Sequence, residues 1–221
     1  MSILFKVFRK IRRFATEPKK TLREWRNGRA RKKLGMLLGD TQRSYLSSNC
    51  LAQMCYQVQN QPYKSPTIAA VIVPRDFVKF CANLKEYLAL TPAIDEQESA
   101  RQGFPVLRLG DIRIDCIHAK DAEYEKARFV ERCGRVDFDN LVLMMSERDG
   151  CTVEDLIAFD ALPYKHKLVF TAQDYPFIKS ALCLPSQNTP SVAEDTVTYV
   201  YRLNRRKRWD RLARLILGSA H

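Results

Sequence analysis

Three polar residues with catalytic chemistry follow or end short apolar runs that the sequence predicts as strands: His118, Asp76 and Asp149. A histidine has an ordinary pKa near 6.5, so an imidazole close to carboxylates is suited to act as a general base at neutral pH. We therefore predict these three residues as catalytic. The alternative for His118 is a hydrogen-bonded core histidine without a catalytic role.

Five further residues have side chains suited to holding a substrate. Amides donate and accept hydrogen bonds, and guanidinium groups bind phosphate through a planar pair of donors. The predicted substrate-binding residues are Asn49, Arg75, Arg148, Arg132 and Arg135. The first three follow predicted strands, whereas the last two lie on the helix after His118, where a solvated helix face is the alternative.

The spacing of the apolar residues predicts the elements that position these groups. Short β-branched runs bounded by proline or glycine predict strands, and apolar steps of three and four residues predict helices. The run Ile68–Val73 lies between two prolines and leads into a helix over 77–87. The predicted order is β-α-β-α-β-β-α-β-α-β, with strands over 43–47, 68–73, 104–109, 112–118, 140–146 and 167–172.

This alternation predicts an α/β fold with a layered, mostly parallel sheet and flanking helices. The carboxyl ends of parallel strands meet at one edge, where such sheets bind ligands, so the polar residues are expected in one pocket there. Residues 91–103 are polar and predict a surface loop. Residues 181–184 and 197–203 are expected as edge strands, and 204–218 as a final amphipathic helix.

The net charge of +12 is concentrated at the two ends of the chain. Residues 1–40 contain thirteen Lys and Arg against three acids, and residues 202–214 contain seven against one. The remaining residues are net negative, which argues against a nucleic-acid-binding core and for basic ends that contact an anionic surface. We predict a basic amphipathic helical arm over 1–40, an α/β domain over 41–203 and a basic C-terminal helix over 204–221.

Residues 2–15 have the pattern of a helix that lies in a membrane interface. On a helical wheel, one side carries apolar residues and the other carries cations: Ile3, Leu4, Val7, Phe8, Ile11 and Phe14, opposite Lys6, Arg9, Lys10, Arg12 and Arg13. We predict that residues 2–15, helped by 204–217, bind an anionic membrane surface. Two alternatives are packing on the domain itself and a cleaved targeting peptide.

Several signatures of cofactors and other folds are absent from the sequence. No stretch of eighteen apolar residues occurs, and the seven cysteines contain no CxxC pair. Neither GxGxxG, GxxxxGK[ST] nor GxSxG is present. We therefore predict no metal and no cofactor. The unpaired cysteines within apolar runs are typical of a reducing compartment, so a cytoplasmic protein at the inner face of the membrane is expected.

A set of short segments resembles one bacterial family. They are Ser48-Asn49-Cys50, Ser65-Pro66-Thr67, Asp76-Phe77, Asn83–Leu88, Phe104-Pro105-Val106, Ile117-His118, Arg148–Thr152, Phe159-Asp160 and Leu162-Pro163-Tyr164. Together they span roughly residues 43–175 and resemble the domain of unknown function 1919 family, whose members are often labelled exopolysaccharide biosynthesis proteins. Cys50 stands where members tend to have a second asparagine, and Phe129 where they tend to have a tryptophan.

The resemblance implies a role in bacterial exopolysaccharide or surface-polysaccharide biosynthesis. With the polar strand ends, it favours a sugar-modifying or glycosyl-type transferase acting on a sugar or lipid-linked sugar at the cytoplasmic membrane face. The alternative is a non-catalytic accessory protein that docks on a membrane-bound polysaccharide synthase through the basic helices. A shared pocket for His118, Asp76 and Asp149 favours the enzyme, and scattered positions favour the accessory protein.

Overall fold

A four-stranded parallel sheet forms the centre of the protein. The computed structural model describes residues 18–184 and 206–218. The strands are β1 (Ser44–Ser47), β5 (Leu141–Ser146), β6 (His166–Thr171) and β7 (Ala181–Cys183), arranged in the order β1-β5-β6-β7. Each neighbouring pair is parallel, which confirms the predicted α/β class.

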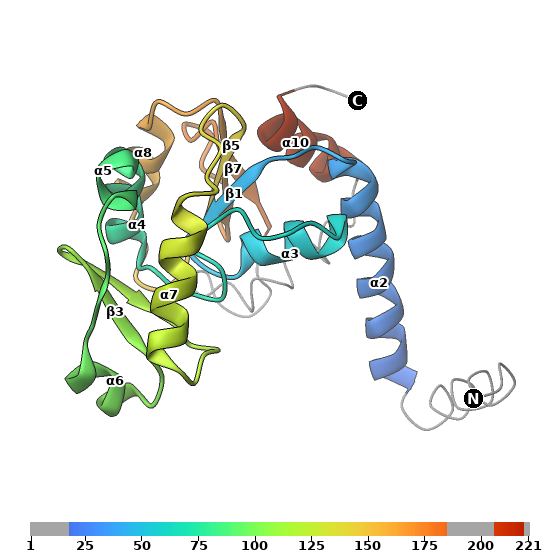
Figure 1. Ribbon diagram of the computed structural model, residues 1–221. Coiled ribbons are helices and arrows are strands. Elements are labelled where there is room, and N and C mark those ends of the chain that lie inside the picture. The colour runs from blue at the N-terminus through green and yellow to red at the C-terminus, as the bar shows by residue number, and fades with distance from the viewer. Residues whose placement is uncertain (1–17, 185–205, 219–221) are drawn as a thin grey trace, which may run out of the picture.

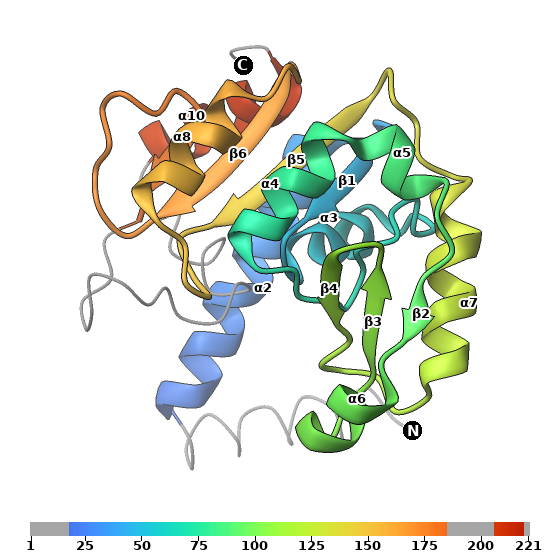
Figure 2. The ribbon, with the colours of Figure 1, turned by 90° about the vertical axis from the view of Figure 1, so that its left-hand side faces the viewer.

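Helices cover both faces of this sheet because alternate residues of each strand point to opposite sides. In β5, Leu143 and Met145 face one core and Val142 and Met144 face the other. Figure 2 shows helices in front of the sheet and behind it. The front helices are α4 (Pro74–Ala82) and α8 (Val153–Ala161), and the rear ones are α2 (Pro18–Leu38), α3 (Leu51–Gln59) and α10 (Arg206–Leu217).

A second, antiparallel sheet corrects the prediction of one sheet. Its strands are β2 (Ala93–Ile94), β3 (Val106–Leu109) and β4 (Ile112–Asp115), in that order. The two-residue connection at Gly110, which has a φ of +61°, joins β3 and β4 as a hairpin, so they cannot be parallel. The expected loop over 91–103 contains β2 and α6 (Glu96–Gln102) instead, and Asp95 caps α6 by accepting a hydrogen bond from the Glu98 amide.

The prediction of a strand over 68–73 is wrong. This segment is irregular and makes only a single bridge, between Val71 and Asp115. Its apolar side chains instead fill both cores, with Ile68 on the α3 side and Ile72 on the α4 side. The apolar run therefore reflects burial and not strand pairing. The helix that follows begins at Pro74 and breaks at Asn83, where α5 (Leu84–Leu88) starts.

Both basic ends include a helix that packs on the domain. Leu34 and Leu38 of α2 are buried in the rear core, together with Trp209, Leu212 and Ile216 of α10. The predicted C-terminal helix is confirmed, and its apolar side is covered by the sheet. Figure 1 shows the first turns of α2 extending away from the body. The predictions for residues 2–15 and 197–203 fall outside the described residues, and no described helix is long and apolar enough to cross a membrane.

Candidate functional site at the carboxyl edge of the parallel sheet

Buried polar groups meet where β1 and β5 end. Asn49 directly follows β1 and is only 3% exposed, and its Nδ2 donates a hydrogen bond of 2.7 Å to Oγ of Ser146, the last residue of β5. The parallel pairing continues beyond β1, because the Ser48 amide donates to the Met144 carbonyl at 3.1 Å. The structure therefore places Asn49 at the sheet edge, as its position in the sequence predicts.

The Ser65-Pro66-Thr67 segment closes the end of β1. The Ser47 amide donates to Oγ1 of Thr67 at 3.0 Å, and the Thr67 and Ser65 hydroxyls lie 3.1 Å apart. Farther along, the Ile72 amide donates to the Ser48 carbonyl at 2.9 Å. These bonds satisfy strand-end groups that would otherwise be buried without partners. The segment is therefore structural support for the edge.

Glu147 is a buried carboxylate at this edge that the sequence reasoning missed. It follows β5, is 8% exposed, and accepts hydrogen bonds from the Ala172 amide at 2.7 Å and from the Tyr175 hydroxyl at 2.5 Å. Burial and the bond to Glu147 raise the pKa of Tyr175 to about 12. The available signal was its position directly after a buried strand, one residue before the predicted Arg148.

A cleft of about 330 Å³ opens beside Tyr175, between α10 and the segment joining β6 to β7. Its lining includes two arginines, one carboxylate and one thiol: Arg208, Arg211, Asp174 and Cys183. Arg211 is fixed in place, because its guanidinium donates to the carbonyls of Ala181 at 2.6 Å and Lys179 at 3.1 Å. The pair of buried Glu147 and partly buried Tyr175 therefore adjoins an open cleft with cationic donors.

Among the described residues, neither His118 nor Asp76 takes part in the hydrogen bonds at this edge. His118 is exposed in a turn after β4, and β4 belongs to the antiparallel sheet, so the expectation that it ends a parallel strand is wrong. Asp76 lies in the first turn of α4, where its carboxylate accepts a bond from the Arg113 amide at 3.4 Å. Within the described residues, no hydrogen bond or ion pair joins His118 to Asp76 or Asp149.

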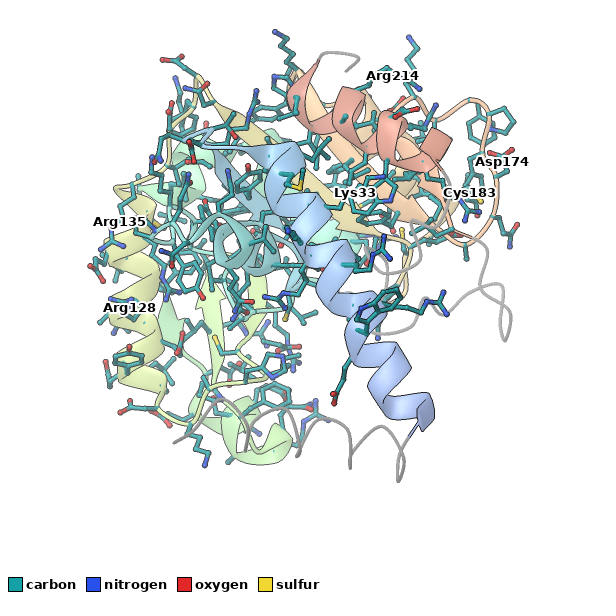
Figure 3. The ribbon with its side chains drawn as sticks, turned by 90° about the vertical axis from the view of Figure 1, so that its right-hand side faces the viewer. Lys33, Arg128, Arg135, Asp174, Cys183 and Arg214 are labelled. Carbon is teal, nitrogen blue, oxygen red and sulfur yellow. The ribbon has the colours of Figure 1, made fainter. Side chains whose placement is uncertain are left out.

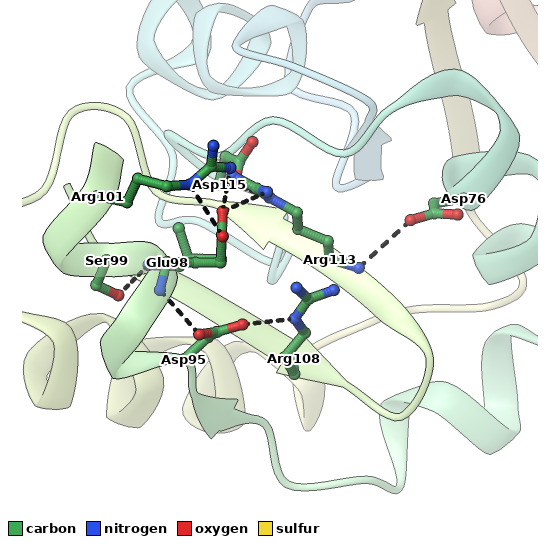
Figure 4. Close-up of polar contacts among 9 residues, drawn as sticks. Asp76, Asp95, Glu98, Ser99, Arg101, Arg108, Arg113 and Asp115 are labelled. Atoms are coloured by element: carbon green, nitrogen blue, oxygen red, sulfur yellow. Dashed lines mark hydrogen bonds and ion pairs between the residues drawn. The ribbon is translucent and has the colours of Figure 1, made fainter. Parts of the chain in front are cut away.

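The surroundings of Asp76 consist of ion pairs. Arg113 donates to Asp115 at 2.7 Å and to Glu98 at 2.9 Å, and Arg108 donates to Asp95 at 2.9 Å. Figure 4 shows these pairs on one side of the antiparallel sheet, with Asp76 beside Arg113. The half-buried network holds α6 against the β3–β4 hairpin, so we assign it a structural role.

The other predicted residues divide between the edge and the periphery. Asp149 and Arg148 follow β5 at the edge; Asp149 is exposed in a turn with a φ of +56°, and Arg148 is partly buried. Arg75 is exposed on α4. Arg132 and Arg135 belong to α7 (Ala122–Cys133) and the turn after it, against the 60–64 loop. Figure 3 shows Arg135 on the side of the molecule opposite Asp174 and Cys183.

The hydrogen bond between Tyr175 and Glu147 should make the protein sensitive to alkaline pH. A tyrosine whose pKa is raised by folding stabilises the protein below its unfolded pKa of about 10, and this contribution is lost as pH rises toward the folded pKa of about 12. We expect Tyr175→Phe to reduce the loss of unfolding free energy between pH 10 and 12 and to cost about 1 kcal/mol at pH 7. Denaturant unfolding at several pH values measures the pH dependence and the cost at pH 7.

Tyr124→Phe, at an exposed position, is the control for this prediction. Identical pH curves for Tyr175→Phe and wild type would contradict the assignment of the pH dependence to the Tyr175–Glu147 hydrogen bond.

The fold and its edge define an α/β protein whose parallel sheet ends in buried polar groups beside a cleft. Among the described residues, no group of three or more His, Cys, Asp or Glu side chains is placed to hold a metal ion. Residues 21–212 match the family model described as domain of unknown function (DUF1919). This range is most of the chain, so the protein belongs to that family.

One curated relative adds to this result. It is an uncharacterized protein of Haemophilus influenzae, 33% identical over 136 residues. The alignment covers 62% of this chain and 65% of the relative, so the chain spans less than two thirds of the relative's length.

Proposed function

We propose that this protein acts in bacterial surface-polysaccharide synthesis by binding a sugar that carries a phosphate at the carboxyl edge of its parallel sheet. The family resemblance supports the pathway, and parallel sheets characteristically bind ligands at this edge. The observation that carries the proposal is the hydrogen bond between buried Glu147 and Tyr175, which lines a cleft together with Arg208 and Arg211.

The arrangement supplies the groups that a sugar transferase requires. Arginines bind the phosphates of a nucleotide-linked or lipid-linked sugar through charge-assisted hydrogen bonds. A carboxylate held by two donors is positioned to accept a proton from an attacking sugar hydroxyl. We therefore propose Glu147 as the general base in place of His118, with Arg208 as the phosphate ligand and Asn49 as part of the supporting edge.

Replacing Arg208 should weaken nucleotide-sugar binding. A hydrogen bond to a charged group contributes about 1.5–3 kcal/mol, so we expect Arg208→Met to raise the Kd for UDP-glucose by about 10- to 100-fold. Isothermal titration calorimetry measures this change. The matched control is Arg214→Met, an exposed position on the same helix and outside the cleft lining, which should change the Kd less than twofold. Equal Kd values for Arg208→Met and wild type would exclude the cleft as the phosphate site.

Among the described residues, no hydrogen bond or ion pair joins His118, Asp76 and Asp149, which favours a second candidate function, a non-catalytic accessory protein that docks on a membrane-bound polysaccharide synthase. Lys33 of α2 lies over the ring of Trp209 at 4.7 Å, so a cation of α2 lies against the basic helix α10 (Figure 3). In this case we expect polymer production in cells to survive Glu147→Gln and to fail with Arg29→Glu on the outer part of α2. If the protein is instead a transferase, polymer production should fail with Glu147→Gln and survive Arg29→Glu.

A further inference from the structure

Arg132 is a buried cation that forms no ion pair with any carboxylate of the described residues. Its side chain lies on α7, the residue is 7% exposed, and its Nε is buried with no hydrogen-bond partner. Among the described residues its guanidinium forms no ion pair and no hydrogen bond. It contacts the ring of Tyr63, whose centre lies 5.3 Å from the guanidinium carbon.

The neighbouring charges do not compensate Arg132. Glu131, the residue before Arg132, is shared by two other arginines: Arg128 donates to it at 2.8 Å, and Arg135 also bonds to it. Burial and the Arg128 cation lower the pKa of Arg132, although Glu125 opposes this shift. The environment therefore disfavours the charge that Arg132 carries.

An unpaired buried charge costs free energy, because desolvation is not repaid by a partner. A cation–π contact with a tyrosine contributes about 0.5–2 kcal/mol and offsets only part of the several kcal/mol that burial of an ion costs. Arg135 fixes the adjoining loop by donating to the Tyr63 carbonyl at 3.2 Å, so the loop is held without the help of the Arg132 guanidinium. The missing element at Arg132 is an anion.

A cleft of about 410 Å³ lies next to Tyr63, at the end of α3 and the start of the loop that follows it. Figure 1 shows this loop running back along α3 toward α7. Its lining combines two tyrosines, one proline and three amide side chains: Tyr56, Tyr63, Pro62, Gln57, Asn60 and Gln61. Amides are suited to sugar hydroxyls, and aromatic rings to the apolar side of a sugar ring. Tyr63 connects the two features, since it lines the cleft and contacts Arg132.

We propose that Arg132 and the adjoining cleft form a second binding site, for a phosphorylated monosaccharide, with the phosphate on Arg132 and the sugar over Tyr63. This site lies on α7 and the 60–64 loop, away from Asp174 and Cys183 (Figure 3). It therefore does not depend on the cleft at the carboxyl edge. A guanidinium with free donors binds phosphate through a planar pair of hydrogen bonds, which a lysine does not reproduce.

Thermal unfolding with sodium phosphate and with glucose 1-phosphate tests the proposal, with sodium chloride at matched ionic strength as the reference. We expect glucose 1-phosphate to raise the Tm of the wild-type protein by about 3–6 °C for each tenfold excess over its Kd. Arg132→Met should abolish this rise, and Arg132→Lys should weaken binding about tenfold. Arg101→Met, at an exposed arginine paired with Glu98 on α6, should keep the full rise.

The Tm without ligand supplies an independent readout. Because Arg132→Met removes an unpaired buried charge, it should leave the Tm unchanged or raise it. A lower Tm for Arg132→Met, together with no rise for wild type in glucose 1-phosphate, would show a purely structural arginine. An equal rise in wild type, Arg132→Met and Arg101→Met would show unspecific anion binding and would also overturn the proposal.

Discussion

Deleting residues 1–15 should release the protein from anionic vesicles while leaving its thermal unfolding unchanged. The segment carries six apolar residues opposite five cations. Partial burial gives each apolar side chain a fraction of the roughly 1.5–3 kcal/mol available on full burial, and each cation adds about 1 kcal/mol at an anionic surface. We therefore expect the deletion to weaken vesicle binding by at least about tenfold. Co-sedimentation with phosphatidylglycerol vesicles measures the change.

Salt and point variants separate the two contributions to vesicle binding, which are the burial of apolar side chains and the attraction of cations to the anionic surface. Raising the salt concentration from 0.1 to 1 M shortens the Debye length from about 10 to about 3 Å, so the electrostatic part should fall. Phe8→Ser, on the apolar face, should weaken binding, whereas Phe5→Ser, off that face, is the matched control. If the truncated protein binds vesicles as well as the full chain, or loses its fold, residues 1–15 do not form a membrane anchor.

The C-terminal helix is expected to contribute to that binding only through its cations. Trp209, Leu212 and Ile216 are buried in the core behind the sheet, so this apolar face is not available to lipid. Arg214 is exposed on the opposite side. The two basic ends therefore differ physically: we propose insertion of apolar side chains for residues 2–15 and surface attraction alone for α10.

Leu38→Ala should lower the free energy of unfolding by about 2–5 kcal/mol. Leu38 ends α2 and is 0% exposed in the rear core, so truncation removes buried methyl groups and leaves a cavity. Met36 stands two residues earlier on the same helix and is 75% exposed. Met36→Ala is therefore the matched control and should change the unfolding free energy by less than about 0.5 kcal/mol.

Urea unfolding followed by circular dichroism measures both substitutions. Equal losses for Leu38→Ala and Met36→Ala would mean that the end of α2 does not pack on the domain. A large difference between them would show that the basic arm divides in function, with its last turns serving the fold and its first residues free to contact a partner. This outcome bears directly on how much of the N-terminus can be removed in functional experiments.

Local signals in the sequence determined most of the helices and the strands of the parallel sheet. A capping box of Thr152 and Asp155 is a local signal for the start of α8, and the structure contains both of its hydrogen bonds. The buried run at 140–146 and the apolar stripe of α10 were also correct. These signals depend on residues within one or two turns of each other, so they can be recognised without knowing the fold.

Pairing between distant segments was decided only by the tertiary structure. The sequence did not show that β3 and β4 leave the main sheet, or that the run 68–73 fills two cores without forming a strand. For the same reason it took the strand before His118 as part of the parallel sheet, whereas that strand belongs to the antiparallel hairpin.

The candidate site also combines features that local sequence signals predict with features that only the tertiary structure decides. Asn49 and Arg148 were predicted at strand ends and lie there, because a strand end is a local property. The pairing of Glu147 with Tyr175, and the burial of Arg132 without a partner, depend on segments brought together by packing. Burial and hydrogen bonding are properties of the surroundings of a side chain, and those surroundings come from parts of the chain that a local pattern does not include.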